Sequence, residues 1–179
     1  MLDFVKKALH YLHNLEWSER QQQHCVFCHR EELPEVVYVE DGVFAIENRR
    51  LAGEQHWLIL PEKHGWRDIE NLTAEDLPLL EAMERMKKRL LASRCPDLSP
   101  STVVSGFHRG RRRLLGNIYY PDIVSIHHLH LHVIVRPRRL LRLFKYPAWL
   151  PLMWKSDDRV MQHVRKLAGP DNGLSKPGR

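Results

Sequence analysis

Residues 128–134 carry the pattern that most constrains this chain, HLHLHVI, in which three histidines alternate with apolar residues. Side chains of a β-strand point alternately to its two faces, so the pattern predicts a strand with one apolar face and one row of imidazoles. Histidine has no packing advantage in a strand, which favours a functional cluster over a chance polar face, with a row of metal ligands as the rival interpretation. Because imidazole titrates near neutral pH and is nucleophilic when neutral, the segment indicates chemistry at an electrophilic centre such as phosphorus.

The rest of the pattern predicts an α+β domain with a mainly antiparallel five-stranded sheet and one long helix. The strands are expected at 36–39, 43–46, 56–60, 103–107 and 123–135. Asp41-Gly42 between the first two strands is a strong hairpin signal. The helix is expected to start at Thr73 as its N-cap, and its buried stripe is expected to consist of Leu77, Leu80, Met83, Met86 and Leu90.

Both ends of the chain are expected to extend this domain. A chain of 179 residues favours one domain, here 21–167, with an N-terminal helical extension at 1–20. Residues 140–154 are apolar and irregular, and a last helix is expected at 157–167. The tail at 168–179 has little apolar content and is expected to be disordered.

The charge distribution points to phosphate-bearing partners. The formal net charge is +6, and the basic residues gather at 109–113 and 136–145. Such a surface favours polyanions, although a solvated face that keeps the protein soluble is the simpler interpretation. No apolar run reaches the roughly 20 residues that span a bilayer, and residues 1–17 lack a signal-peptide core. We therefore expect no membrane partner and a location in the cytoplasm or nucleus.

The triad and three upstream segments, taken together, resemble one known family. His-φ-His-φ-His-φ-φ, with φ apolar, is the signature of the histidine-triad (HIT) superfamily, and residues 128–134 contain it complete. Cys-x-Phe-Cys at 25–28, HWLILPEKH at 56–64 and Gly-Phe-His at 106–108 resemble its histidine-triad nucleotide-binding (HINT) branch, in particular the third subtype. The Gly-aromatic-His segment also resembles aprataxin, which removes adenylate from DNA ends. The resemblance covers roughly 25–135 and implies a HIT-like fold.

The resemblance implies a catalytic role for four residues. His130 would be the nucleophile, and His132 would lie beside the scissile bond and assist proton transfer to the leaving group. Ser125 would contact the leaving group or the phosphate, and His128 is the first member of the triad.

The resemblance also implies a nucleotide pocket. Its residues would be Phe27 and Ile46 as an apolar wall, Asn48 at the ribose, His56 lining the pocket, and His108 near the phosphates. A strand histidine with its hydrogen bonds satisfied is the alternative interpretation of the last two. Two features depart from the family pattern. Asn48 stands where an Asp is usual, which removes a charge-assisted bond to the ribose, and a long Arg-rich loop at 109–121 separates Gly-Phe-His from the triad.

The cysteine pair suggests a metal centre. Cys25 and Cys28 have the spacing of half a zinc site or of a redox pair. The resemblance implies His64 and His128 as the two remaining ligands, with a structural Zn²⁺ rather than a catalytic one.

The resemblance implies a hydrolase that cleaves nucleoside phosphoramidates or acyl-nucleotides at the α-phosphorus and releases a nucleoside monophosphate. Purine nucleotide conjugates are the expected partners, and a homodimer is possible. Two alternatives stay open: an aprataxin-like DNA 5′-adenylate hydrolase, and a nucleotide-binding regulator with little turnover. Nucleic acid is not favoured, because the sequence beyond Val135 holds no Cys/His set for a DNA-gripping zinc finger.

Overall fold

The structure is a computed structural model that describes residues 25–29, 32–33, 35–115, 118–120, 122, 124, 126–139, 146–147 and 149–169. The expected N-terminal extension at 1–20 and nearly all of the tail at 168–179 lie outside these residues. Within the described ranges, no helix combines the length and the apolar character needed to cross a bilayer.

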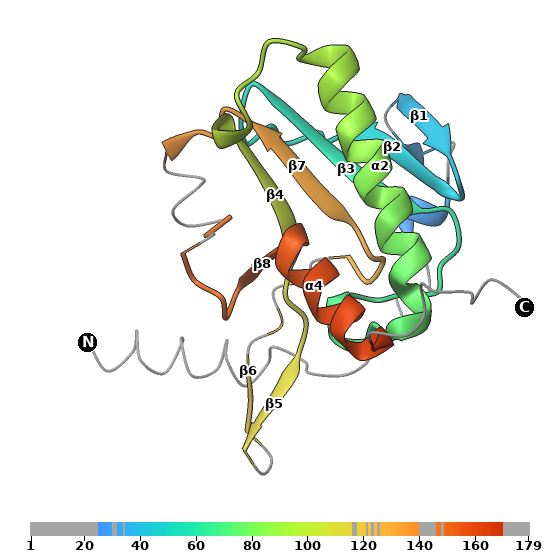
Figure 1. Cartoon of the computed structure of the whole chain (residues 1–179), viewed down its shortest axis with the longest axis vertical. Coiled ribbons are helices and arrows are strands. Elements are labelled where there is room, and N and C mark those ends of the chain that lie inside the picture. Colours follow the sequence, from blue (N-terminus) through green and yellow to red (C-terminus); the bar gives the residue numbers. More distant parts are fainter. Residues whose placement is uncertain are drawn as a thin grey trace, which may run out of the picture.

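One antiparallel sheet forms the centre of the molecule, and two helices cover one of its faces (Figure 1). Its six strands run in the order β1 (Val36–Glu40), β2 (Val43–Glu47), β3 (Gln55–Pro61), β7 (Leu131–Val135), β4 (Val103–His108) and β8 (Trp154–Ser156). The helices are α2 (Leu77–Arg94) and α4 (Asp157–Ala168). A separate ribbon of β5 (Arg112–Leu115) and β6 (Ile118–Tyr120) projects from the body. Short 3₁₀ turns lie at Val26–Cys28, Ile69–Asn71, Ala74–Asp76 and Pro100–Thr102.

The first hairpin follows from its turn residues, as expected from the sequence. Asp41 and Gly42 both have positive φ, 51° and 73°, which is the requirement of the two-residue turn that matches strand twist. Glycine adopts this conformation without strain and Asp tolerates it, so β1 and β2 pair directly across the turn.

The long helix also begins as the sequence predicts. Thr73 and Asp76 form a reciprocal capping box around one 3₁₀ turn, and α2 follows with a proline in its first turn. Leu80, Met83, Met86 and Leu90 are buried against the sheet, and Leu77 is partly buried. Burial of each such side chain contributes about 1.5–3 kcal/mol, so this stripe fixes the helix on the sheet.

A buried ionic cluster ties α4 to the rest of the fold. The Lys87 ammonium lies 2.5 Å from Asp157 and 2.6 Å from Glu84. Asp157 also accepts a hydrogen bond of 2.9 Å from Ser105 on β4. Although burial opposes the charge, the Asp157 carboxylate holds the pKa of Lys87 above its ordinary value. Lys87 of α2 therefore links this helix to α4 and, through Asp157, to β4.

Three sequence-based expectations are wrong in detail. The sheet has six strands rather than five, because residues 154–156, at the junction between the segment expected to be irregular and the last helix, pair with β4. The strand expected at 123–135 begins at Leu131, since the Leu129 N–H donates to the Trp66 carbonyl at 2.7 Å rather than to a neighbouring strand. The loop at 109–121 contains the β5–β6 ribbon, which the sequence did not predict because the residues of β5, Arg-Arg-Leu-Leu, show no alternation of polar and apolar side chains.

The face of the sheet opposite the helices carries two smaller apolar clusters. One consists of Cys25, Phe27, Phe44, Ile46, Leu58 and Leu60. The other consists of Ala52, Val104, Ile134, Tyr146 and Trp154. His132 lies on this same face, because it is two residues before Ile134 on β7. The two clusters therefore border the region in which the triad lies.

Candidate active site and metal centre

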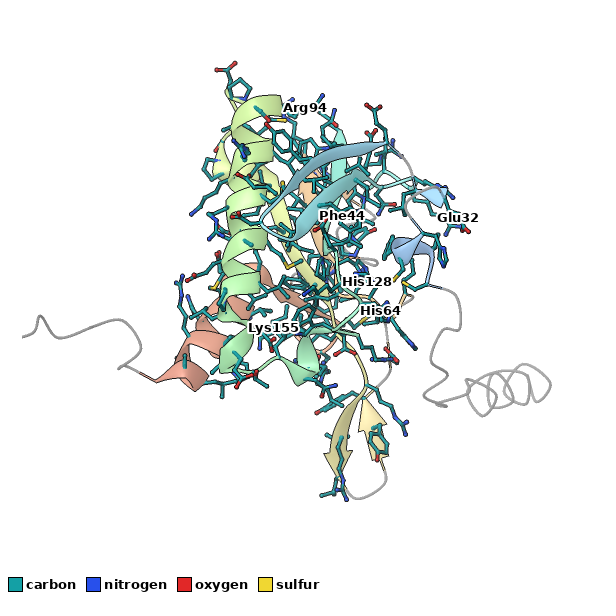
Figure 2. All side chains as sticks on the ribbon, turned by 90° about the vertical axis from the view of Figure 1, so that its right-hand side faces the viewer. Glu32, Phe44, His64, Arg94, His128 and Lys155 are labelled. Atoms are coloured by element: carbon teal, nitrogen blue, oxygen red, sulfur yellow. The ribbon has the colours of Figure 1, made fainter. Side chains whose placement is uncertain are left out.

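The three triad histidines are buried together, but they do not form one straight row. His132 lies in β7, between Leu58 of β3 and Gly106 of β4, whereas His128 and His130 belong to the segment before the strand. The ring centroids of His130 and His132 are 4.8 Å apart. His128 instead packs against His64, with centroids 4.9 Å apart, on the side of the sheet away from α2 (Figure 2). The bent backbone thus separates one histidine from the other two.

The hydrogen bond of His130 fixes its tautomer. Its Nδ1 lies 2.7 Å from the His128 carbonyl oxygen, which can only accept, so Nδ1 carries the proton. In the neutral ring the lone pair is then on Nε2. Burial lowers the pKa of His130 below the ordinary imidazole value. His130 is therefore held as a neutral imidazole with a nucleophilic Nε2 at neutral pH.

A second chain of contacts orients His132 through His56. The Asn48 Oδ1 accepts from the Arg50 N–H at 2.9 Å, which turns the amide nitrogen toward His56 Nε2 at 3.3 Å. His56 Nδ1 lies near both the Arg50 carbonyl at 3.2 Å and the Ala52 N–H at 3.3 Å. The Asn48 amide and the Arg50 carbonyl both suit the tautomer of His56 whose proton is on Nδ1; in that tautomer Nδ1 has no lone pair to accept the Ala52 N–H. His56 Nε2 then accepts from His132 Nδ1, 3.0 Å away.

This arrangement gives Asn48 a contact that the sequence did not suggest. Its amide is engaged by His56 and by the backbone of Arg50 in this structure. A carboxylate at this position accepts but does not donate, so Asp would favour the other tautomer of His56.

The remaining pocket residues implied by the family pattern also gather here. Phe27 packs edge-on against His128 and His130, with centroids at 5.9 Å and 5.6 Å, and shares an apolar cluster with Ile46. The His108 ring lies 4.9 Å from that of His132. Ser125 lies outside the described residues.

Two aromatic residues of the site were missed by the sequence analysis. Tyr146 and Trp154 are buried against His108 and His132. They lie in or next to the segment interpreted as irregular, where no motif or periodicity marks them as part of a site.

An arginine before the long helix was missed as well. The Arg67 guanidinium pairs with Asp68 and Asp122 and lies 3.0 Å from His127 Nε2. It thereby ties the loop after β3 to the segment that leads into the triad. The adjacent Arg67 and Asp68 give no sequence signal for these contacts, because Asp122 and His127 lie 55 and 60 residues away from Arg67.

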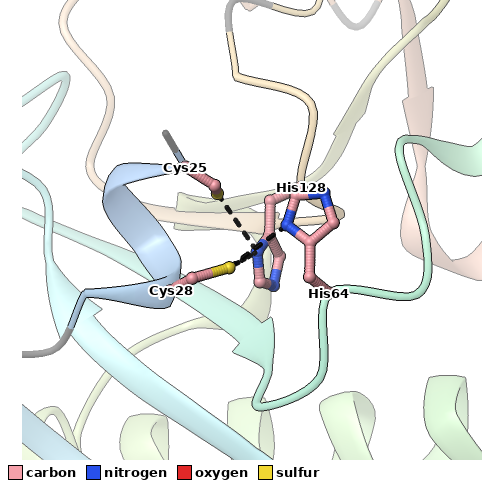
Figure 3. A group of neighbouring side chains, drawn as sticks. All are labelled: Cys25, Cys28, His64 and His128. Atoms are coloured by element: carbon pink, nitrogen blue, oxygen red, sulfur yellow. Dashed lines mark hydrogen bonds between the residues drawn. The ribbon is translucent and has the colours of Figure 1, made fainter. Parts of the chain in front are cut away.

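Four side chains form a compact candidate metal centre (Figure 3). They are Cys25, Cys28, His64 and His128, and their ligand atoms all lie within 4.8 Å of one another. His128 Nδ1 is 3.5 Å from the Cys25 sulfur and 3.7 Å from the Cys28 sulfur, and His64 Nδ1 is 3.2 Å from the Cys28 sulfur. A tetrahedral zinc with ordinary Zn–S and Zn–N lengths places such atoms about 3.6 Å apart.

The protonation of His128 suits this centre. Its Nε2 lies 2.9 Å from the Pro61 carbonyl oxygen, so Nε2 carries the proton and the Nδ1 lone pair faces the sulfurs. Burial, together with His64 and His130, lowers the pKa of His128 to about 4. A neutral imidazole is the form that binds metal, so the four residues fit a tetrahedral Zn²⁺.

The arginine-rich ribbon is anchored beside the site. Glu70 accepts a bidentate pair of 2.8 Å bonds from Arg109 and a bond of 3.1 Å from Arg112. Although burial opposes it, these two guanidiniums hold the pKa of Glu70 below its ordinary value. Arg109 and Arg112 also donate to the carbonyls of Pro151 and Leu152. The base of the ribbon is therefore fixed to the body.

Comparisons with known proteins agree with this geometry. The family DcpS_C, described as scavenger mRNA decapping enzyme C-term binding, matches residues 22–142. Aprataxin from Danio rerio is 32% identical over 101 residues, which cover 55% of this chain and 26% of that protein, so the chain spans about a quarter of that relative. Adenosine 5′-monophosphoramidase HINT3 from Xenopus tropicalis is 28% identical over 131 residues, 70% of this chain and 76% of that protein.

A solved structure, the HIT family hydrolase from Clostridium thermocellum, has a TM-score of 0.49 and 20% identity, and covers 63% of this chain and 90% of that one. The family match spans well over half of the chain and includes the complete triad. The expectation of a HIT-like α+β fold is confirmed. The chain belongs to the scavenger mRNA decapping enzyme C-term binding family and, with it, to the histidine-triad superfamily.

Proposed function

We propose that the chain cleaves purine nucleoside phosphoramidates or acyl-nucleotides at the α-phosphorus and releases a nucleoside monophosphate. The observation that carries the proposal is His130, which is buried, neutral, and held by the His128 carbonyl with its lone pair on Nε2. Such an imidazole is prepared to attack an electrophile without first losing a proton. The cytoplasm or nucleus is the proposed location.

The reaction proceeds in two displacements. His130 Nε2 forms a bond to the α-phosphorus while the bond to the leaving amine or acylate breaks. An amine leaves with the Nε2 proton of His132, which takes part in this step as the imidazolium because its Nδ1 proton is held by His56. Water then attacks the nucleotidyl-histidine, His132 takes a proton from it, and the nucleoside monophosphate departs. His132 is placed for both proton transfers, because its ring centroid lies 4.8 Å from that of His130 and its Nδ1 is hydrogen-bonded to His56. Ser125, named by the family pattern, is the proposed contact to the leaving group.

The proposed zinc acts through structure. Held by Cys25, Cys28, His64 and His128, a zinc ion cross-links three segments of the chain that meet at the triad. The His128 carbonyl also accepts the His130 proton, so fixing His128 fixes the nucleophile as well.

A substrate panel tests the function. Adenosine 5′-phosphoramidate, acyl-adenylates and diadenosine polyphosphates are incubated with the protein, and released AMP is quantified by chromatography. We expect turnover of the first two classes, with an adenine substrate preferred over a cytosine one. Tight AMP binding by calorimetry without turnover of any substrate would replace the enzyme with the nucleotide-binding regulator.

The acid limb of the pH profile gives a second check. His130 attacks when neutral, so the rate falls as the pH falls through its pKa, which burial places below the ordinary value of 6.5. We therefore expect kcat/KM to stay high at pH 6.5 and to decline at lower pH, after subtraction of the uncatalysed rate. A half-maximal rate above pH 7 on this limb would contradict a neutral buried nucleophile.

The ribbon favours a second candidate function, removal of adenylate from DNA 5′ ends. Arg113 pairs with Tyr119 across the ribbon, and the guanidinium of Arg111 lies 3.9 Å from the Tyr119 ring centroid on the same face. Guanidiniums beside an exposed aromatic ring suit both the phosphates and the bases of a strand. The ribbon projects from the body (Figure 1), and its base follows His108 along the chain, so it can bind DNA whose adenylated end reaches His130.

The double variant Arg111→Ser/Arg113→Ser tests this candidate. If DNA is a substrate, we expect its kcat/KM on 5′-adenylated nicked DNA to fall by roughly tenfold or more at low salt, with phosphoramidate turnover unchanged. Arg85→Ser/Arg89→Ser removes the same charge near β1, far from the ribbon, and is the matched control. Absence of AMP release from the DNA by the unaltered protein at low and physiological salt would exclude the candidate.

A further inference from the structure

We propose that the segment after the triad strand supplies two positioning residues, Tyr146 and Trp154, that hold the imidazole of His132 in one orientation for proton transfer. The inference rests on the proposed hydrolase function and assigns part of its machinery to new residues. Both lie beyond the residues 22–142 that the family match covers.

The two rings complete an aromatic enclosure around His132. Its ring centroid lies 5.2 Å from that of Tyr146 and 5.7 Å from that of Trp154. The rings of His56 and His108 also contact it, with centroids at 5.3 Å and 4.9 Å. Tyr146 itself contacts His56 at 5.4 Å and His108 at 5.3 Å, and Trp154 packs edge-on against it at 5.6 Å. All three pocket histidines thus contact the same tyrosine.

The backbone is shaped to admit the indole. Gly106 on β4 lies directly opposite His132 on β7. A Cβ at Gly106 would stand 2.8 Å from the Trp154 ring and 2.5 Å from the Lys155 carbonyl oxygen. The φ of Gly106 is 158°, at the limit of the range that side chains disfavour, so the close approach is the stronger reason for glycine here. The missing side chain lets Trp154 of the neighbouring strand reach the catalytic face.

The enclosure restricts the motion of the His132 ring and excludes water from it. Tyr146 is 1% exposed and Trp154 is 2% exposed, so together they separate His132 from bulk water on this side. A hydrogen bond in such surroundings is stronger than in water, which favours the single bond from His132 Nδ1 to His56 Nε2. Burial also raises the pKa of Tyr146 to about 12, so its hydroxyl stays neutral and adds no charge beside the histidines.

If Tyr146 and Trp154 acted only on the stability of the fold, their replacement would lower the unfolding midpoint and leave kcat unchanged. The test therefore measures both quantities. Tyr146→Leu removes the ring, Tyr146→Phe keeps it, and Trp154→Leu opens the enclosure from the other side. Met83→Ala is the matched control, because Met83 is equally buried on α2 against the opposite face of the sheet. For each protein, kcat and KM are measured on an adenosine phosphoramidate, urea unfolding gives the midpoint, and ¹⁵N NMR reports the tautomer of His132.

The positioning role predicts a distinct set of results. Tyr146→Leu and Trp154→Leu are expected to lower kcat by roughly 10- to 100-fold with little change in KM, as a misplaced catalytic group does. Tyr146→Phe is expected to stay within about threefold of the unaltered protein, because the ring and not the hydroxyl does the positioning. Met83→Ala is expected to lose stability at full kcat. In NMR, His132 is expected as the Nδ1–H tautomer in the unaltered protein and as a mixture in Tyr146→Leu.

The outcomes distinguish a failure of the positioning role from a failure of the proposed hydrolase function. If folded Tyr146→Leu or, should that variant not fold, Trp154→Leu retains the unaltered kcat, the positioning role is wrong and the hydrolase remains. If the unaltered protein turns over no nucleotide conjugate, the proposed function fails. The NMR comparison then decides alone, and an unchanged His132 tautomer in the variant overturns the inference.

Discussion

Replacement of His130 by alanine is expected to abolish turnover, with kcat/KM for an adenosine phosphoramidate lower by a factor on the order of 10⁴ or more. The reason is that the Ala variant has no group at this position that can form the bond to phosphorus. His130 Nε2 is the nitrogen left unprotonated by the 2.7 Å bond to the His128 carbonyl. Steady-state kinetics with AMP detection measure the effect.

Binding and a distant histidine provide the controls. Because the apolar wall and the His56 contacts remain, the affinity of His130→Ala for AMP is expected to change by less than about tenfold, measured by calorimetry. His163 is exposed on α4, so His163→Ala makes the same substitution away from the site and should keep full activity. A His130→Ala protein that turns over at the original rate would refute the assigned nucleophile.

Removal of the metal is expected to have the largest effect on stability. Zinc sites of this kind contribute about 10 kcal/mol to folding at neutral pH, which is comparable to the whole stability of an ordinary domain. Even a loss of about 5 kcal/mol would lower the melting temperature of a chain this size by roughly 10–20 °C. We therefore expect Cys25→Ser, or exhaustive chelation, to lower the melting temperature by at least this amount and to reduce activity, since the His128 backbone holds His130.

The third cysteine supplies the control for this experiment. Cys95 lies at the end of α2, outside the metal cluster, so Cys95→Ser should keep both the zinc content and the melting temperature. Elemental analysis of the purified protein is expected to give one zinc per chain, and Cys25→Ser much less. A zinc-free protein whose melting temperature is unaffected by Cys25→Ser would contradict the proposed centre.

Most of the fold could be predicted from local signals in the sequence. The Asp41-Gly42 turn, the Thr73 cap and the apolar stripe of α2 each depend on neighbouring residues, so each could be predicted. The bend before His130 could not, because it depends on a hydrogen bond from Leu129 to Trp66, far away in the sequence. A sixth strand of three residues is likewise too short to show an alternating pattern.

The site was predictable to the extent that its residues stand in motifs. The histidine row indicated chemistry at an electrophilic centre, and the Cys pair gave half of the metal cluster. The family resemblance supplied His130 as the nucleophile, together with His64 and His56. Tyr146, Trp154 and Arg67 act by packing and by long-range ion pairs, which leave no periodic trace in the sequence. The regular spacing of the triad also suggested one row of imidazoles. In the structure, the bent backbone instead places His128 beside the cysteine sulfurs and His130 beside His132.

The central claim is a covalent nucleotidyl intermediate on His130, and mass spectrometry tests it most directly. The protein is mixed with an adenosine phosphoramidate, denatured within the first turnovers at alkaline pH, where a phosphorus–nitrogen bond to histidine survives, and digested for peptide mapping. The account predicts a mass increase of one adenylyl group on the peptide containing residues 128–132, located by fragmentation to His130 and absent from His130→Ala. An adenylyl group on another residue, or rapid turnover in which the trapped protein stays unmodified, would contradict it.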